Sequence, residues 1–428
     1  MDLIDFHKLY VNSSGICTDT RKIKFNCVFF ALKGERFDGN ALAAEAITLG
    51  AKYAVIDNPV YCSENTILVA DVLAYLQSYA NYYRNTLLAP IFALTGSNGK
   101  TTTKELIHAV LSSTYYTIAT IGNLNNHIGV PLTLLSFDES MRYGIVEMGA
   151  NHQLEIAKLC EIAQPDAGLI TNVGLAHLEG FGGLDGVKRG KGEMYDYLYN
   201  HHKKILVNSD DTILCEMLAE RRIENALQYG SNDNAEVIGT LINDTEYITI
   251  KYEDIIIYTQ MYGSYNFSNF MAAIAVGKLY GISNQLIKKG LENYIPSNQR
   301  SQRIIWNNNI IILDAYNANP SSMQIAIENF AHINSENKIV ILGDMYELGA
   351  ESLQEHVRIL QLALSYKFKQ LVLVGTHFGE FNQYTSAVFI PNIIEASKWW
   401  SEQSFKNSYI LIKGSRGIEL EKMLTNIL

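Results

Sequence analysis

The chain has 428 residues, of which 48% are hydrophobic, so it is long enough for two or three domains with separate cores. Its 44 acidic residues outnumber its 34 basic residues, and the net charge of −10 provides no diffuse positive field to attract nucleic acid or an anionic membrane surface. A nucleic-acid motor is therefore disfavoured, and any phosphate-bearing ligand must be bound locally.

The first residues, MDLIDFHKLY, contain neither a basic leader nor a long apolar core. No later apolar run approaches the length that spans a bilayer. We therefore expect a cytoplasmic protein without membrane insertion. The five cysteines are scattered and form no Cys-x-x-Cys pair, which favours neither a disulfide framework nor a zinc site.

Residues 1–88 contain short apolar runs, such as CVFFALKG and YAVI, between charged or Gly-containing turns. A helical stretch rich in Tyr and Leu follows, so a small α/β domain is predicted. From Pro90 onward, the β-rich runs IFALT, YGIVEM, DAGLITNV and KILVN alternate with helical patterns. This alternation predicts a mostly parallel sheet covered by helices over residues 89–298.

The end of this second region differs in pattern. Residues 235–262 alternate β-branched and polar side chains, as an antiparallel meander does, and helices are predicted near 266–280 and 283–293. The segment YIPSNQRSQR then predicts a linker. After it, NIIILDAY, KIVILGDM, QLVLVG and YILIKGS are four apolar strands that each end in Gly or Asp, which predicts a third α/β domain over residues 299–428.

Residues 92–105, FALTGSNGKTTTKE, contain a shortened phosphate-binding loop. Only two residues separate Gly96 from the Gly-Lys-Thr triplet at 99–101, where four are usual. The strand before the loop and the helix after it are both present, as phosphate binding requires. We expect Lys100 to reach the outer phosphates and the Thr101 hydroxyl to hold Mg²⁺, although an ordinary Gly-rich turn is the alternative for this stretch alone.

Two further polar side chains follow other strands of the same predicted sheet. Glu147 ends YGIVEM, and His177 lies beyond LITNV. Ligands of a parallel sheet bind at the carboxyl ends of its strands, so both side chains would face the edge that carries the phosphate loop. Taken singly, a Glu is usually a solvated surface group and a His a core residue. Together at one edge, they favour Mg²⁺ ligation.

The next segment, HLEGFGGLDGVKRGKGEMYDYL, contains clustered glycines that predict a mobile loop before a helix. The glycines do not fit the dinucleotide fingerprint, because Asp185 stands where the third glycine should be. Lys188, Arg189 and Lys191 are expected at the start of that helix, where the helix dipole disfavours positive charge. Ligand binding and a solvated basic turn are both consistent with this placement.

These segments resemble the Mur ligases of bacterial cell-wall synthesis, whose own form of the loop is TGSNGKTT. The resemblance covers nearly the whole chain, through TDTRKIKFNCVFFALKGERFDGN, GNLNNHIGVPLTLL, VEMGANHQLEI, TNVGLAHLEGFGGLDGVKRGKGEMY, DAYNANPSSM, LGDMYELGAES and KGSRGIELE. Of these, YNANP and LGDMYELG most resemble the branch of the family that adds a dipeptide.

The resemblance implies an α/β protein of three domains: residues 1–88 bind a UDP-sugar, residues 89–298 form a P-loop ATPase, and residues 299–428 form a Rossmann-like domain that brings the second substrate. It implies a monomer that uses ATP and Mg²⁺. The γ-phosphate of ATP would pass to the carboxylate of UDP-N-acetylmuramoyl-tripeptide, and the amine of D-Ala-D-Ala would then attack the acyl phosphate. Phosphorylation is needed because a carboxylate is a poor electrophile, and catalysis is mainly positioning and charge stabilisation.

The resemblance also implies site residues. ATP would contact the loop residues Gly96, Ser97, Asn98, Gly99, Lys100, Thr101 and Thr102, together with Asn269, Arg300, Asp314, Tyr316 and Asn317. Magnesium would be held by Thr101, Glu147, His177 and Lys191, and the catalytic residues would be Lys100, Lys191 and His177. The UDP-sugar substrate would contact Thr18, Asp19, Thr20, Arg21, Asn125 and Asn126, and the dipeptide carboxylate would contact Lys413, Ser415 and Arg416.

Lys191 corresponds to a lysine that relatives carry as a carbamate, in which a neutral amine and CO₂ form a carboxylate able to hold metal. Lys188 is a rival within the same segment. Tyr265 stands where many members have His, and Asn319 and Pro320 are interpreted as turn-forming residues.

Two other functions remain open. One is a sibling ligase that adds a different amino acid. The other is a non-catalytic ATP-binding switch, which Glu147, His177 and Lys191 together disfavour because a switch need not build two metal sites.

Overall fold

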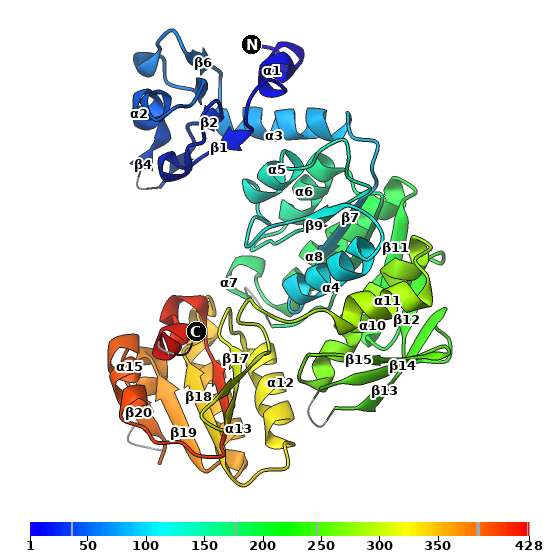
Figure 1. The fold of residues 1–428 in the computed structure, drawn as a ribbon, viewed down its shortest axis with the longest axis vertical. Coiled ribbons are helices and arrows are strands. Elements are labelled where there is room, and N and C mark those ends of the chain that lie inside the picture. Colours follow the sequence, from blue (N-terminus) through cyan, green and yellow to red (C-terminus); the bar gives the residue numbers. More distant parts are fainter. Residues whose placement is uncertain (36, 176–177, 245–246, 382–385, 426, 428) are drawn as a thin grey trace.

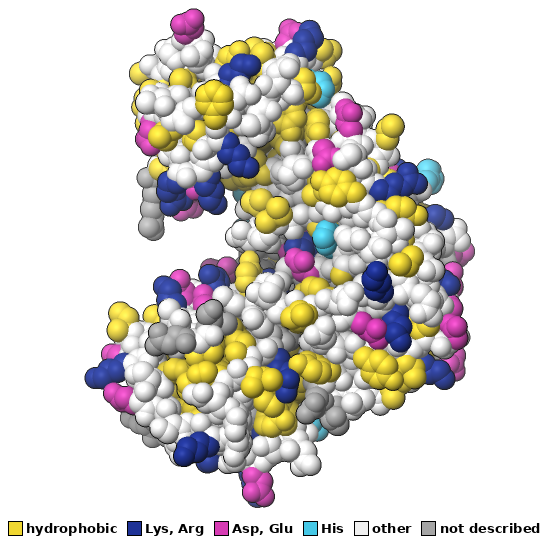
Figure 2. Space-filling model, viewed as in Figure 1, with side chains coloured by type: hydrophobic (Ala, Val, Ile, Leu, Met, Phe, Trp, Pro, Cys, Tyr) yellow, Lys and Arg dark blue, Asp and Glu magenta, His cyan; other side chains and the backbone are white. Residues whose placement is uncertain are grey.

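The computed structural model describes residues 1–428 except 36, 176–177, 245–246, 382–385, 426 and 428. Three α/β parts follow one another along the chain, and the central part joins the two outer ones (Figure 1). The space-filling view shows a wide opening between the N-terminal and C-terminal parts, which the central part joins on the right (Figure 2). Among the described residues, no helix combines the length and the apolar character needed to cross a bilayer.

The N-terminal part contains a parallel four-stranded sheet in the order β1-β2-β5-β6. Its strands are β1 (Ile16–Cys17), β2 (Val28–Phe30), β5 (Tyr53–Ile56) and β6 (Thr66–Leu68), and a small hairpin joins β3 (Lys33–Gly34) to β4 (Phe37–Asp38). The helices are α1 (Leu3–Tyr10), α2 (Ala43–Thr48) and α3 (Val72–Arg84), with short 3₁₀ turns η1 (Thr20–Lys22), η2 (Gly39–Leu42) and η3 (Pro59–Tyr61). The predicted small α/β unit is therefore confirmed.

Helix α3 attaches the N-terminal part to the central part. The Tyr83 hydroxyl donates to the Phe137 carbonyl at 2.8 Å, and the Arg84 guanidinium binds the Asp166 carboxylate at 2.7 Å. Arg84 also donates to the carbonyls of Ala163 and Gln164 at the end of helix α6 (Glu155–Ala163). Buried residues of both parts belong to one hydrophobic core.

The central part is built on a nine-stranded sheet in the order β15-β14-β13-β12-β11-β10-β7-β9-β8. Its parallel strands are β7 (Ile91–Thr95), β8 (Thr117–Ala119), β9 (Tyr143–Glu147), β10 (Ala167–Ile170), β11 (Lys204–Asn208), β12 (Leu227–Gly230) and β13 (Val237–Asn243). Antiparallel strands β14 (Thr249–Tyr252) and β15 (Ile255–Tyr258) complete the sheet. The four predicted strands and the meander are confirmed, whereas the short strands β8 and β12 were not predicted.

The helices of the central part cover both faces of this sheet. They are α4 (Lys100–Ser112), α5 (Gly129–Leu134), α6, α7 (Leu178–Phe181), α8 (Leu184–Asn200), α9 (Thr212–Glu220), α10 (Phe267–Leu279) and α11 (Asn284–Glu292), with the 3₁₀ turn η4 (Ser264–Asn266). The helices predicted near 266–280 and 283–293 are α10 and α11. Helix α10 is buried on nearly all sides, which fits its position between α4 and the sheet.

The loop predicted after residue 177 is shorter than expected: Gly182 and Gly183 form the turn between α7 and α8, with φ of 71° and 102°, whereas Gly180, Gly186, Gly190 and Gly192 lie within the two helices. The mobility of this turn stays a prediction. A Cβ on Gly186 would lie 1.8 Å from the Phe181 carbonyl oxygen, and a Cβ on Gly190 would lie 2.4 Å from the Phe181 ring. The glycines therefore allow α7 to pack closely against α8. A single-sequence pattern cannot distinguish this use of glycine from a flexible turn.

The predicted conflict between basic residues and the helix dipole also does not arise. Helix α8 begins at Leu184, so Lys188, Arg189 and Lys191 lie beyond its first turn. The dipole acts mainly within the first turn. The unusual feature of Lys191 is its burial, which is described below.

The C-terminal part has a six-stranded sheet in the order β16-β17-β21-β18-β19-β20. Strand β16 (Gln302–Trp306) is antiparallel, and β17 (Asn309–Asp314), β18 (Lys338–Gly343), β19 (Gln370–Val374), β20 (Val388–Ile390) and β21 (Tyr409–Lys413) are parallel. The helices are α12 (Pro320–Ala331), α13 (Ser352–Ser365), α14 (Thr376–Gly379) and α15 (Ile393–Ser401), with 3₁₀ turns η5 (Gly349–Glu351), η7 (Arg416–Ile418) and η8 (Leu420–Leu424). The four predicted strands are present.

The linker between the last two parts is shorter than predicted, because β16 begins inside the YIPSNQRSQR segment. Asn307 and Asn308 form the two-residue turn of the β16–β17 hairpin with φ of 48° and 62°, a conformation that Asn tolerates. The three-part α/β architecture is confirmed. The limits of the parts at residues 88 and 298 stay a prediction.

Candidate functional site

A cavity of about 790 Å³ lies between the central and C-terminal parts. It is lined by the following residues among those predicted to bind ligands: Ser97, Asn98, Gly99, Lys100, Thr101, Thr102, Asn125, Asn126, Glu147, Asn269, Arg300, Asp314, Tyr316, Asn317 and Lys413. Residues that lie far apart in the sequence thus meet in one place. His177 lies outside the described residues.

The phosphate loop has the tight shape that its glycines predict. Gly96 has φ of 146° and Gly99 has φ of 77°, and a Cβ on Gly96 would lie 2.0 Å from the Thr171 hydroxyl oxygen. Lys100 is the first residue of α4, and its Nζ donates to the carbonyls of Gly96 at 2.6 Å and Ser97 at 3.2 Å. Burial lowers the pKa of Lys100 to about 8, an effect that Glu147 opposes and Arg300 strengthens.

Two residues that sequence reasoning missed hold the tip of this loop. The backbone N–H of Asn98 donates to the Asn172 side-chain oxygen at 3.0 Å, and the Asn98 carbonyl accepts from the Thr171 hydroxyl at 2.6 Å. Both residues follow β10 directly. A possible signal was their position, because polar residues just past a strand of the same sheet lie at its ligand-binding edge.

Glu147 lies at the end of β9 and is only 2% exposed. Its Oε1 accepts a hydrogen bond from the Asn125 side chain at 2.8 Å, whereas its Oε2 is buried and has no hydrogen-bond partner among the described residues. Burying a carboxylate oxygen without a donor costs free energy, so this oxygen fits a cation at the cavity wall. Asn125, which was predicted to face the muramoyl substrate, therefore also positions Glu147.

Lys191 is 1% exposed, with its Nζ 5.1 Å from the centre of the Phe181 ring and 3.3 Å from the Ala150 carbonyl oxygen. Burial lowers the pKa of Lys191 to about 7, with a further contribution from the charge of Lys100, while Glu155 and Glu193 oppose the change. A large fraction of this amine is therefore neutral near neutral pH.

The rival lysine has a different environment. The Nζ of Lys188 lies 2.7 Å from the Glu220 carboxylate at the end of α9, and this hydrogen bond raises the pKa of Lys188. Its amine is accordingly protonated and paired at the protein surface. Of the two lysines, Lys191 alone has the lowered pKa that carbamate formation requires.

The linker side of the cavity carries a second basic group. The Arg300 guanidinium lies 3.9 Å from the centre of the Tyr316 ring, and its Nε is buried without a partner among the described residues. Asn269 accepts from the Thr103 hydroxyl at 3.0 Å and lies against Gly99. Tyr265, which stands where relatives have His, is bonded to the Ser301 hydroxyl at 2.7 Å.

The residues predicted to bind the dipeptide all have partners within the C-terminal part. Lys413 is buried and binds Asp314 at 2.6 Å. Ser415 donates to the Ala318 carbonyl at 3.2 Å, and Arg416 is exposed and pairs with Glu421 at 2.5 Å. Ser415 and Arg416 do not line the cavity.

The residues predicted to bind the UDP-sugar are divided between two places. Thr18, Asp19, Thr20 and Arg21 lie in the N-terminal part around η1, away from the cavity, where Asp19 accepts from the Arg21 backbone N–H. Asn126 lines the cavity wall, and its side-chain oxygen accepts from the backbone N–H of Gly129 at the start of α5.

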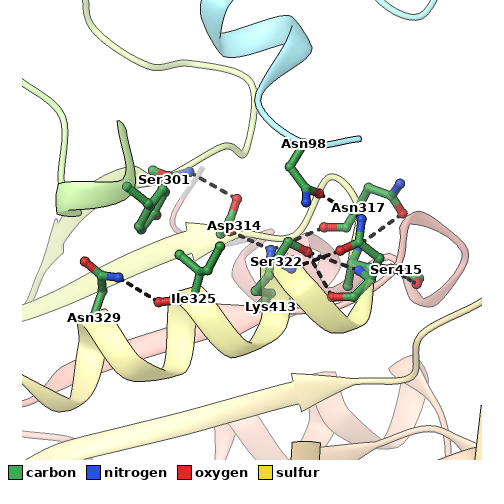
Figure 3. Close-up of polar contacts among 12 residues, drawn as sticks. Asn98, Ser301, Asp314, Asn317, Ser322, Ile325, Asn329, Lys413 and Ser415 are labelled. Atoms are coloured by element: carbon green, nitrogen blue, oxygen red, sulfur yellow. Dashed lines mark hydrogen bonds and ion pairs between the residues drawn. The ribbon is translucent and has the colours of Figure 1, made fainter. Parts of the chain in front are cut away.

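The C-terminal part is docked on the central part by side chains of α12. Asn319 donates to the Asn98 side-chain oxygen at 2.8 Å, and the Ser321 hydroxyl accepts from the Leu175 backbone N–H at 3.0 Å. Farther along α12, Asn329 accepts from the Ser264 hydroxyl at 2.7 Å. Figure 3 shows Ser322, Ile325 and Asn329 along α12, with Asn98 near the first turn of that helix. Sequence reasoning interpreted Asn319 as a turn-forming residue and missed this contact.

Comparisons with known proteins give one consistent result. Three family models match: the Mur ligase family catalytic domain over residues 12–84, the Mur ligase middle domain over 94–277, and the Mur ligase glutamate ligase domain over 299–416. The chain is 33% identical to the UDP-N-acetylmuramoyl-tripeptide–D-alanyl-D-alanine ligases of Bacillus subtilis and of Escherichia coli, in each case over 97% of this chain and 93% of the relative.

Solved structures agree. The structure is similar to MurF from Acinetobacter baumannii, with a TM-score of 0.86 and 29% identity over 98% of both chains. It shares its fold with the MurF ligase from Thermotoga maritima in complex with ADP, with a TM-score of 0.85 and 24% identity over 97% of both chains. From its family-model matches and its full-length relatives, the chain belongs to the Mur ligase family.

Proposed function

We propose that the protein is an ATP-dependent ligase that joins D-Ala-D-Ala to UDP-N-acetylmuramoyl-tripeptide, releasing ADP and phosphate, in peptidoglycan precursor synthesis. The observation that carries the proposal is the cavity whose wall combines a phosphate loop with a buried carboxylate oxygen of Glu147, to which no described residue donates a hydrogen bond. The full-length similarity to ligases of that name supports the choice of substrates. We further propose that it acts as a monomer in the cytoplasm.

The reaction needs two displacements. The carboxylate of the tripeptide attacks the γ-phosphorus of ATP and ADP leaves; the amine of the dipeptide then attacks the acyl carbon, the amide forms and phosphate leaves. The backbone of the phosphate loop and Lys100 would hold the ATP phosphates, with Arg300 above Tyr316 on the linker side. Asn269, Asp314 and Asn317 would line the rest of the nucleotide.

Residues beside the phosphate loop fit a bound Mg²⁺. When bound, Mg²⁺ would neutralise charge on the phosphates, and we propose that Thr101, Glu147, His177 and the carbamate of Lys191 would hold it. The free Oε2 of Glu147 is the structural support for this set. Asn125 fixes the other oxygen of that carboxylate, so the free one has a defined direction.

The proposed ligase reaction requires that phosphate release depends on both substrates other than ATP. We expect ADP and phosphate only when UDP-N-acetylmuramoyl-tripeptide and D-Ala-D-Ala are present together, because the acyl phosphate forms on one and is consumed by the other. Single amino acids such as D-Glu or meso-diaminopimelate serve as controls. Turnover with one of these in place of the dipeptide would identify a sibling ligase, and ATP binding without any ADP formation would identify a switch.

Glu147→Gln tests the proposed magnesium site. The amide keeps the size of the side chain but provides no anionic oxygen. We therefore expect the Mg²⁺-dependent gain in ADP affinity to fall by about 10- to 100-fold or more, since a fall of this size is typical when a metal site loses one partner. The measurement is ADP titration calorimetry with and without Mg²⁺, and the exposed Glu161→Gln on α6 is the matched control. If the Mg²⁺ effect were the same in both variants, Glu147 would not be a ligand.

A further inference from the structure

One side chain of the phosphate loop is bonded to the C-terminal part of the protein. The Asn98 side-chain oxygen accepts from the Asn319 side-chain nitrogen at 2.8 Å, although the two residues lie 221 positions apart. The contact is at the junction where the first turn of α12 meets the loop (Figure 3). No other residue of the loop from 96 to 102 forms a hydrogen bond to the described C-terminal residues, so Asn98 is the point at which the loop is attached to them.

The two halves of Asn98 have different partners. Its backbone is held within the central part, because its N–H donates to Asn172 and its carbonyl accepts from both Thr171 and Asn172. Its side-chain oxygen is held by Asn319 from the other part. The loop backbone therefore keeps its shape by central contacts, while the orientation of the Asn98 side chain depends on docking.

Asn319 is fixed just as closely. Its side-chain oxygen accepts from the Ser322 backbone N–H at 2.9 Å and caps α12, which leaves its nitrogen to bond Asn98. Asn319 is 9% exposed, so both bonds lie in a largely buried position. Beside it, Ser321 accepts from the Leu175 backbone N–H, in the same segment whose Gly174 is bonded to the Ser97 hydroxyl. The start of α12 thus contacts the loop directly and through residues 174–175.

We propose that the Asn98–Asn319 pair is a latch through which docking of the C-terminal part fixes the phosphate loop for ATP, with Asn319 as a positioning residue that acts through Asn98. The inference rests on the proposed nucleotide site. The cavity has walls from both parts, so ATP is enclosed only when they are docked. A bond between the loop tip and α12 links nucleotide affinity to docking, and by reciprocity nucleotide binding then favours docking.

Asn319→Ser separates the two functions of this side chain. Serine is a good N-cap, so α12 keeps its cap, but its hydroxyl is too short to bond Asn98 as well. We expect ADP affinity to fall about three- to tenfold, as for the loss of one hydrogen bond, with an unchanged melting temperature. The KM for ATP should rise by a similar factor, and kcat at saturating ATP should stay within about twofold because bound ATP restores docking.

A double-mutant cycle distinguishes the latch from independent effects. Asn98→Ala should lower ADP affinity, and adding Asn319→Ser to it should cause little further loss, since the bond is already gone. Asn392→Ser, at the N-cap of α15, is the matched control and should leave ADP affinity unchanged. Additive losses in the cycle, or full ADP affinity in a folded Asn319→Ser variant, would overturn the latch.

ADP binding is measured without either carbon substrate, so this test is independent of the ligase assay. If the ligase proposal failed while the cycle still showed coupling, the latch would stand as a property of a nucleotide site with another function. If Asn319→Ser did not fold, Asn319→Asp, another good N-cap that lacks the donor nitrogen, would take its place in the cycle.

Discussion

Lys100→Ala is expected to reduce ATP-dependent turnover by at least about 10²- to 10³-fold, the effect typical of removing one preorganised group that stabilises transition-state charge. The Nζ of Lys100 now bonds two carbonyls of the loop, and burial holds its pKa near 8. Lys100 lies at the wall of the cavity and has no carboxylate in hydrogen-bond contact among the described residues, so its amine is suited to an anionic ligand. Phosphate release in the presence of both carbon substrates measures the loss.

The fold should survive this change. Alanine is a good helix former at the first position of α4, and Ser97, one of the two residues whose carbonyl loses its donor, lines the cavity. Circular dichroism melting should therefore match the wild type within a few degrees. Lys278→Ala, which removes an exposed lysine paired with Glu253 on the same part, is the control and should retain activity. Unchanged turnover in Lys100→Ala would refute the phosphate-loop assignment.

Lys191→Ala is expected to lose turnover and to regain part of it when acetate or formate is added. Alanine leaves space beside Phe181 and Ala150 in which a small carboxylate can replace the oxygens of the proposed carbamate. Rescue should saturate with the concentration of the added acid. Lys188→Ala provides a matched control on the same helix, because that lysine is paired with Glu220 at the surface and should be dispensable. Rescue that failed at all concentrations would count against the carbamate, though not against the ligase.

The proposed carbamate of Lys191 would have a pH dependence that can be measured without turnover. Only the neutral amine reacts with CO₂, and the lowered pKa of about 7 means that Lys191 becomes neutral as the pH rises through that value. We expect the carbamate carbon signal of protein supplied with ¹³C-bicarbonate to grow between about pH 6 and about pH 8 and to disappear in Lys191→Ala. A lysine with an unshifted pKa would show no such rise in this range.

Much of the fold was predictable because its strands are apolar runs of the expected length. The strand IFALT, the loop after it and Lys100 at the start of α4 form a local unit whose sequence determines its shape. Glu147 could be placed because a residue at the end of a parallel strand has one possible edge to face. These predictions depended on short stretches of chain, and the structure places those stretches as expected.

What sequence reasoning missed depends on contacts between distant segments. The glycines of α8 are required by the Phe181 side of α7, and nothing within the pattern itself indicates close helix packing. The partners of Lys413 and Ser415 lie about 100 residues away in the chain, on or just after β17. The KGSRGIELE motif alone therefore could not show that both side chains are already bonded within the C-terminal part. Asn319 was underestimated for the same reason, because its partner Asn98 belongs to another part of the molecule.

Helix α3 has a consequence for how such enzymes can be recombined. The family models divide the chain between residues 84 and 94, yet Arg84 binds carbonyls at the end of α6 and the Asp166 carboxylate, and α3 shares its hydrophobic core with the sheet that follows. A gene fusion that exchanged the first 88 residues for those of a distant homologue would break these bonds and mismatch the packing. Because Tyr79 of α3 also packs against Phe6 of α1, with ring centroids 4.5 Å apart, a cut on either side of this helix would break one of its two sets of contacts.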